Sequence, residues 1–365
     1  MNRALAILLA LFLLVPITAA CGSSDSSEPR PTPTGSPAQT SNPSPQDAKK
    51  VTLRLGYFPN LTHAQPIVGI ALGTFTSTLG PNVQLETKAF NAGPAAIEAL
   101  FAGEIDAAYI GPNPAINGYV KSNGRALRIV AGSASGGVQF VVRSDSGITS
   151  PKDLAGKKIA TPQLGNTQDV ALRAYLIANG LAPREQGGNV TVIPTSNPET
   201  INLFKKREID GAWVPEPWAT RLVKEAGGRV FLDERDLWPN RDFVITHLIV
   251  STKFLEANPQ VVENLIRAHV EVTEWINENP QEAQRIVNAG ILQTTGAQLP
   301  ADVLTEAWTH LRFTYDPIAS SLKKSASDAF RLGYLADKEP DLSGIYDLTL
   351  LNKILKANGL PPVSE

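Results

Sequence analysis

Several short polar segments each follow a run of apolar residues, and their side chains are neutral hydrogen-bond donors and acceptors. Where such a segment opens a helix, free backbone N–H groups add to those donors and favour an anion. An oxyanion could then be held without a buried cation, because hydrogen bonds to an ionised acceptor are roughly twice as strong as neutral ones. The candidate ligand contacts in these segments are Asn60, Thr62 and His63; Asn113; Ser133, Ser135 and Gly136; and Gly165, Asn166, Thr167 and Gln168.

Each segment also has a purely structural interpretation. Asn60 or Thr62 could simply cap a helix, and His63 could be a polar residue satisfied within the fold. The prolines around Asn113 could make no more than a stiff turn, and residues 133–137 could be a flexible link between two strands. We rely most on the segments around Asn60 and Asn166, since both are expected to open helices.

Two further candidates, Glu216 and Trp218, lie in a later segment of the chain. A carboxylate near the ligand would repel a simple anion, so Glu216 favours a ligand that also carries an amine, such as an aminosulfonate. Alternatively, Glu216 points away from the ligand and pairs with Arg221. Trp218 either stacks on the ligand or packs at a hinge.

The sequence favours a binding protein over an enzyme. It contains no GxSxG, HExxH or phosphate-loop motif, and its four histidines form no close pair of the kind that binds a metal. We interpret Asp106 and Asp210 as turn or capping residues at strand starts, and His269 as a surface or interface residue of a long amphipathic helix. We expect no catalytic residues, no cofactor and no metal.

The first fifty residues indicate export and anchoring. Residues 1–20 have a basic residue and then an apolar run too short for an ordinary membrane span, as in a signal peptide. Small residues precede Cys21, the only cysteine, which resembles a lipidation site. An ordinary signal-peptidase cut is the alternative. Residues 21–50 are rich in Ser, Pro, Thr and Gly, a composition typical of a disordered tether.

An internal repeat organises the remaining chain. Residues 104–114, EIDAAYIGPNP, match residues 208–218, EIDGAWVPEPW, at a constant offset of 104 that also aligns Pro94 with Pro198. Short apolar runs alternate with helical patterns throughout, which predicts an α/β fold with mainly parallel strands. Two similar lobes with the carboxyl ends of their strands facing each other would enclose a ligand cleft and close about a hinge. We place lobe one at residues 51–142 plus 243–365, and lobe two at 143–242.

Four segments resemble the solute-binding proteins of ABC importers for aliphatic sulfonates, taurine and nitrate. They are residues 56–64 (GYFPNLTHA), 101–109 (FAGEIDAAY), 153–160 (DLAGKKIA) and 214–218 (VPEPW). The resemblance implies the type II periplasmic-binding-protein fold and an extracytoplasmic lipoprotein, anchored in the cell membrane through Cys21. It also implies a membrane permease as partner, but it does not fix the ligand, since relatives carry sulfonates, nitrate, bicarbonate and pyrimidine precursors. The donor-rich segments above favour a small oxyanion, such as an alkanesulfonate, taurine or nitrate.

Two other functions stay open. The same fold could bind a pyrimidine or thiamine-precursor heterocycle, either for import or as an enzyme of pyrimidine synthesis, or it could serve a membrane-tethered sensor. A net charge of −2 with no basic stripe argues against nucleic acid as a partner. We expect a monomer.

Overall fold

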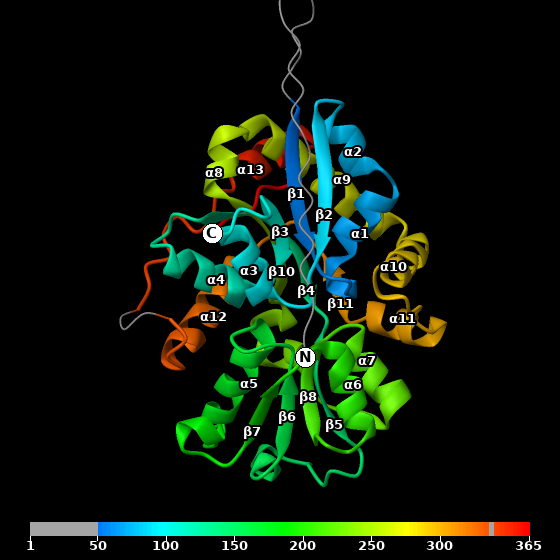
Figure 1. Cartoon of the computed structure of the whole chain (residues 1–365), viewed down its shortest axis with the longest axis vertical. Coiled ribbons are helices and arrows are strands. Elements are labelled where there is room, and N and C mark those ends of the chain that lie inside the picture. The colour runs from blue at the N-terminus through cyan, green and yellow to red at the C-terminus, as the bar shows by residue number, and fades with distance from the viewer. Residues whose placement is uncertain (1–49, 336–338) are drawn as a thin grey trace, which may run out of the picture. The chain divides into compact units, whose positions relative to one another are not determined.

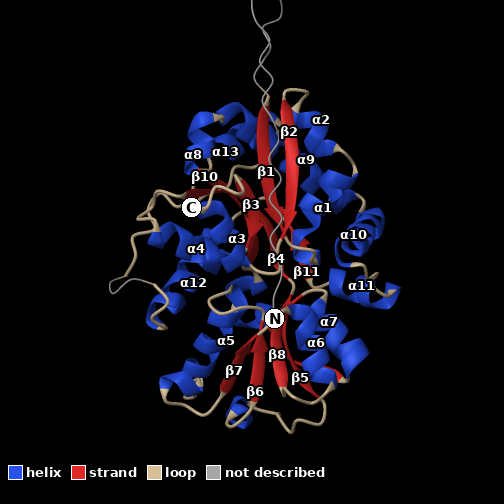
Figure 2. Ribbon diagram, in the orientation of Figure 1, coloured by secondary structure: helices blue, strands red, loops and turns tan. Residues whose placement is uncertain are grey.

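The computed structural model describes residues 50–335 and 339–365, and its longer sheet contains six strands. Figures 1 and 2 show helices on both sides of this sheet. Leu53 and Leu55 alternate with more exposed residues in the first strand and are completely buried beneath those helices. The strand order is β11-β4-β10-β3-β1-β2, with β1 Val51–Tyr57, β2 Val83–Ala89, β3 Ala107–Ile110, β4 Leu127–Gly136, β10 Val244–Ser251 and β11 Leu311–Phe313.

The second sheet contains five strands and is likewise flanked by helices on both faces (Figure 2). Its centre is apolar, with Trp213 and Phe140 fully buried and their rings stacked 5.2 Å apart between centroids. The order is β7-β6-β8-β5-β9, with β5 Val138–Arg143, β6 Lys158–Thr161, β7 Thr191–Pro194, β8 Gly211–Pro215 and β9 Gly228–Asp233. The predicted α/β class is therefore confirmed. The expectation of mainly parallel strands is wrong, because β10 and β11 in the first sheet and β5 in the second pair antiparallel with their neighbours.

Helices connect the strands and cover the sheets. In the longest, α9, residues three or four positions apart form the buried stripe, such as Val262, Leu265, Ala268 and Val272. His269 lies on this stripe and is fully buried between Tyr109 and Gly132, so the prediction that it lies on the surface is wrong. The α-helices are α1 Ala64–Ala71, α2 Thr74–Leu79, α3 Gly93–Phe101, α4 Pro112–Lys121, α5 Thr167–Ala178, α6 Asn197–Lys205, α7 Trp218–Ala226, α8 Thr252–Ala257, α9 Pro259–Glu278, α10 Pro280–Thr295, α11 Ala301–Trp308, α12 Ala319–Arg331 and α13 Thr349–Ala357; the 3₁₀ turns are η1 Leu61–His63, η2 Pro151–Leu154, η3 Arg184–Gln186, η4 Glu234–Leu237 and η5 Pro239–Arg241.

The sequence repeat corresponds to a repeat in strand pairing. Leu55 pairs with Ala107 in the first sheet, and Ile159 pairs with Gly211 in the second, so both partners are shifted by the same offset. The two aspartates expected at strand starts also have equivalent roles. The backbone N–H of Arg54 donates to Asp106 at 2.9 Å, and that of Lys158 donates to Asp210 at 2.9 Å. Each carboxylate thus ties the starts of two parallel strands together.

The chain passes from the first sheet to the second at Gly136 and Gly137, whose φ angles are 76° and 68°. Side chains rarely adopt this left-handed conformation, and a Cβ on Gly137 would lie 2.2 Å from Leu311 Cδ2. We expected this crossing near residue 143. It comes earlier because β5 pairs with β8 and β9 of the second sheet. The chain returns to the first sheet through η4 and η5.

Residues 1–49 and 336–338 lie outside the described part of the chain. The predicted signal peptide, the lipidation of Cys21 and nearly all of the predicted tether fall within the first of these ranges. Among the described residues, no helix combines the length and the apolar character needed to cross a membrane.

Candidate functional site

A small cavity lies where loops of the two sheets meet. Its volume is about 30 Å³. Most of its wall comes from the segments that follow the parallel strands, so the cavity lies beyond their carboxyl ends, as expected for an α/β protein. The lining residues are Phe58, Asn60, Thr62, His63, Asn91, Ala92, Gly111, Pro162, Asn166, Thr167, Gln168, Asn197, Pro215, Ile245 and Thr246.

Three buried polar atoms in this wall have no hydrogen-bond partner among the described residues. They are Thr167 Oγ1, Asn197 Oδ1 and Thr246 Oγ1, and their residues are between 1% and 5% exposed. A buried polar atom without a partner costs about 1–3 kcal/mol, so such atoms are rare and usually serve a purpose. Thr246 comes from the first sheet and the other two from the second-sheet side, so residues with such atoms line the cavity from both sides.

Helix starts surround the same cavity. Asn60 precedes η1, Gly111 precedes α4, and Asn166 precedes α5. Neither Asn60 nor Asn166 caps its helix with its side chain, and Gly111 has no side chain to do so. The helix dipole and these N–H groups together favour negative charge at the cavity.

His63 is the single titratable residue among those that line the cavity. Burial lowers its pKa to about 3, so the imidazole is neutral at pH 7. The N–H of Phe58 donates to His63 Nδ1 at 3.3 Å, which leaves the ring proton on Nε2. The cavity therefore offers neutral donors and helix N-termini, with no carboxylate in its wall to repel an anion.

A buried carboxylate holds the loop between β6 and α5. Asp169 is fully buried and accepts from Gly165 N–H, Thr161 Oγ1 and Arg173 Nε, each at 3.0 Å. These bonds hold Gly165, which has a φ of 73° and does not line the cavity, against the first turn of α5. Of the four contacts predicted in this loop, Asn166, Thr167 and Gln168 line the cavity and Gly165 does not.

Glu216 and Trp218 lie beside the cavity rather than in its wall. Glu216 is fully buried and accepts from Thr220 N–H at 3.0 Å and Thr220 Oγ1 at 2.9 Å, and its carboxylate also pairs with His310 at 2.7 Å. The alternative pairing of Glu216 with Arg221 is wrong, since Arg221 pairs with its helix neighbour Glu225.

Trp218 instead connects the two sides of the cavity. Its indole N–H donates to Asn60 Oδ1 at 2.8 Å. Asn60 follows β1 of the first sheet, and Trp218 begins α7 on the second. The N–H of Leu61 likewise donates to the carbonyl of Glu216 at 3.3 Å. These contacts hold the two sides against each other.

Ser133, Ser135 and Gly136 do not form the expected loop. They belong to β4, because the antiparallel partner β10 pairs along this stretch. Ser133 Oγ donates to Gln65 Oε1 at 2.8 Å, and Ser135 Oγ donates to Asp242. None of the three residues lines the cavity.

Asn113 lies in a neighbouring groove, where its amide donates to the carbonyl of Ser325 at 3.3 Å. Two of the cavity residues that the sequence did not anticipate, Asn197 and Thr246, carry unpartnered polar atoms. Asn197 opens α6 directly before Pro198, the residue that the repeat aligns with Pro94, so the repeat could have pointed to it. Thr246 lies within β10 between two register shifts, and no local sequence pattern marks it.

Comparisons with known proteins agree with this architecture. Residues 46–291 match the model of a family described as the NMT1-like family. The taurine-binding periplasmic protein of Escherichia coli is 26% identical over 220 residues, which are 60% of this chain and 65% of that protein. The alkanesulfonate-binding protein SsuA of Xanthomonas axonopodis pv. citri superposes with a TM-score of 0.69 at 19% identity, over 82% of this chain and 99% of SsuA. The periplasmic nitrate-binding protein NrtA of Synechocystis superposes with a TM-score of 0.68 at 16% identity, over 86% and 90% of the two chains. The fold is that of these binding proteins.

Proposed function

This chain belongs to the NMT1-like family, and we propose that it is an extracytoplasmic solute-binding protein that delivers a small oxyanion to an ABC importer. An alkanesulfonate, taurine or nitrate is the ligand class that the cavity suits. The three relatives described above are named as binding proteins for taurine, alkanesulfonate and nitrate, which supports an oxyanion as the ligand. The protein has a transport role in this proposal and no catalytic one.

The observation that carries the proposal is that three residues with unpartnered polar atoms line one cavity. A ligand oxygen can accept from the hydroxyls of Thr167 and Thr246, and backbone N–H groups at the start of α5 can add to them. Each hydrogen bond to an ionised ligand contributes about 1.5–3 kcal/mol. The side-chain oxygen of Asn197 can accept a hydrogen bond from a hydroxyl or an amine of the ligand. With its amide rotated by 180°, Asn197 would instead donate from its NH₂ group.

We further propose that the two sheets with their helices are two lobes that close around the solute. The contacts between Trp218 and Asn60 and between His310 and Glu216 belong to the closed form in this interpretation. Since Gly136 and Gly137 have left-handed backbone conformations at one crossing, they are the natural position for the hinge.

The proposal for the anchor rests on residues outside the described range. Lipidation of Cys21 would attach the binding protein to the outer face of the membrane, and residues 22–49 would serve as the tether. Metabolic labelling with a radioactive fatty acid tests this, with Cys21→Ser as the control. Label in the parent that is absent from the variant supports the anchor, and an unlabelled parent overturns it.

A thermal-shift screen of residues 50–365 tests the ligand class. The probes are methanesulfonate, taurine, nitrate, bicarbonate and hydroxymethylpyrimidine, each compared with sodium chloride at the same ionic strength. A ligand at a hundredfold excess over its dissociation constant stabilises the folded form by about 2.7 kcal/mol. A shift with one of the oxyanions supports the proposal. A shift with the pyrimidine alone would overturn the ligand class.

A further inference from the structure

A groove of about 360 Å³ adjoins the cavity between α5 and α12. Thr167 lies in the wall of both. Thr167 packs closely against Gly111 of the cavity wall, since a Cβ added to Gly111 would lie 2.4 Å from Thr167 Oγ1. Asn113, two residues after Gly111, lines the groove. The cavity and the groove therefore meet at the first residue of α5, beside a hydroxyl that has no partner among the described residues.

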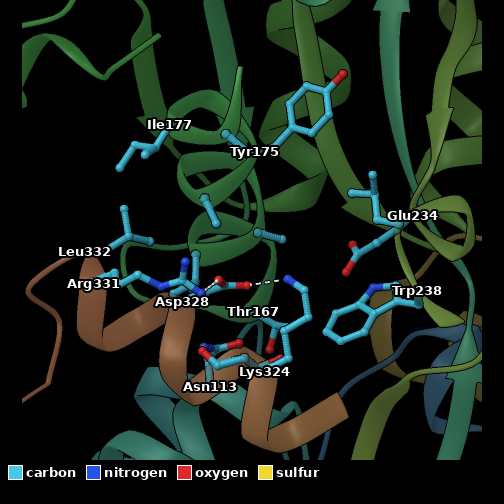
Figure 3. Close-up of a pocket in the computed structure, with 16 residues that line it drawn as sticks. Asn113, Thr167, Tyr175, Ile177, Glu234, Trp238, Lys324, Asp328, Arg331 and Leu332 are labelled. Atoms are coloured by element: carbon cyan, nitrogen blue, oxygen red, sulfur yellow. Dashed lines mark hydrogen bonds and ion pairs between the residues drawn. The ribbon is translucent and has the colours of Figure 1, made fainter. Parts of the chain in front are cut away.

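The wall of the groove is largely apolar. Successive turns of α5 contribute Val170, Ala174 and Ile177, while Leu237 and Trp238 face them from η4 and the residue after it. Figure 3 shows Trp238 and Glu234 on one side of the groove and side chains of α12 on the other. Ile177 and Leu237 are 49% and 40% exposed, so the groove presents apolar surface that the fold itself does not bury.

The charged groups at the groove are already paired. Lys324 and Arg331 both pair with Asp328, at 2.6 and 3.0 Å, as the dashed lines in Figure 3 indicate. Glu234 accepts the indole N–H of Trp213 at 2.6 Å. Two cations share one carboxylate here, and both cations are exposed, so water can compensate the remaining charge. The side of the groove formed by α5, Leu237 and Trp238 suits a neutral apolar or aromatic group.

We propose that this groove is a second compartment of the ligand site, which receives the apolar or aromatic body of an organic oxyanion whose charged head lies in the cavity. The proposal rests on the function proposed above and narrows its ligand class. A cavity of about 30 Å³ admits little more than a head group. The groove of about 360 Å³ falls within the roughly 300–1,000 Å³ typical of small-molecule sites. Inorganic oxyanions would leave it unused.

Isothermal titration calorimetry with methanesulfonate and hexanesulfonate tests the second compartment. Each buried methylene should tighten binding about fourfold, the factor that corresponds to ~0.8 kcal/mol, so hexanesulfonate should bind at least tenfold more tightly. Ala174→Phe fills the groove and should remove this advantage while leaving the methanesulfonate affinity unchanged. Leu237→Ser, at an exposed position, should reduce the advantage without affecting folding. Thr246→Val, in the cavity, should weaken both sulfonates by the same factor.

The outcomes separate this inference from the proposed function. If both sulfonates bind equally well and neither groove variant changes the ratio of their affinities, the second compartment is wrong and the oxyanion function stands. If neither sulfonate binds the parent protein, the inference fails; the oxyanion function fails with it only if taurine and nitrate also give no thermal shift. An advantage of hexanesulfonate that both groove variants reduce supports the inference.

Discussion

Thr246 is the position at which ligand affinity and protein stability should respond in opposite directions to one substitution. Its side chain is 1% exposed, its hydroxyl has no partner among the described residues, and it lines the cavity. Thr246→Val replaces that hydroxyl with a methyl group of similar size. The change removes a hydrogen-bond donor for the ligand and also removes a polar group that the protein buries at a cost.

The magnitudes follow from these two effects. Loss of one hydrogen bond to an ionised ligand costs about 1.5–3 kcal/mol, which raises the dissociation constant roughly 10- to 150-fold at about 1.4 kcal/mol per factor of ten. Removal of an unpartnered buried hydroxyl relieves a desolvation penalty of about 1–3 kcal/mol. The ligand-free variant should therefore unfold at a higher urea concentration than the parent.

Calorimetric titration with methanesulfonate and urea unfolding of the ligand-free protein measure the two effects. The matched control is Thr273→Val, since Thr273 is fully buried and its hydroxyl donates to the carbonyl of His269 at 2.8 Å. The control should lose about 0.5–1.5 kcal/mol of stability and keep its affinity. If Thr246→Val also lost stability and left the affinity unchanged, the hydroxyl would not face the ligand and the reasoning about unpartnered atoms would be refuted.

Three other substitutions probe the surroundings of the cavity. Trp218→Phe leaves Asn60 Oδ1 without its donor, so the closed form should be destabilised by about 1–3 kcal/mol relative to the open form. Methanesulfonate should therefore bind more weakly, and an unchanged affinity would contradict this. Burial raises the pKa of Glu234 from 4.5 to about 7. The folded protein therefore binds this proton more tightly than the unfolded chain, and stability falls by about 3 kcal/mol as the pH rises from 4.5 to 7. Glu234→Gln should abolish that loss, and urea unfolding at pH 5 and pH 8 should show the variant gaining on the parent only at the higher pH. Asp169→Asn removes one of the two carboxylates that pair with buried Arg173, the other being the half-exposed Glu185. Unfolding in urea should reveal a loss of about 3 kcal/mol of stability; a loss below about 1 kcal/mol would show that Glu185 alone satisfies Arg173.

The fold was predictable where the information is local or repeated. Alternating and continuous apolar runs locate the strands, and the repeat around Asp106 and Asp210 correctly implied two sheets of related order. The helix starts at Asn60 and Asn166 were predicted for the same reason, since polar residues between a strand and a helix are a local pattern. Both residues line the cavity.

The errors arise where distant segments decide the outcome. Ser133 and Ser135 have the composition of a loop, yet β10, more than a hundred residues later, pairs with Ser135 and with the residues on both sides of Ser133, which extends β4. His269 has the appearance of a surface residue until β3 and β4 supply Tyr109 and Gly132 as partners. Thr246 becomes a candidate ligand contact only because its strand crosses the region between the two sheets. Such contacts depend on tertiary packing and have no signature in a short stretch of sequence.

The strand order also has a consequence for how the chain acquires its structure. Every strand of the second sheet lies between residues 138 and 233, so this sheet can form as soon as that continuous stretch is available. The first sheet cannot be completed then, because β10 must still enter between β3 and β4. Pairing between such distant segments is slow, since a long loop must close first. During synthesis, the second sheet should thus mature while the first still exposes an unpaired edge of β3, and this edge is where a chaperone would be needed.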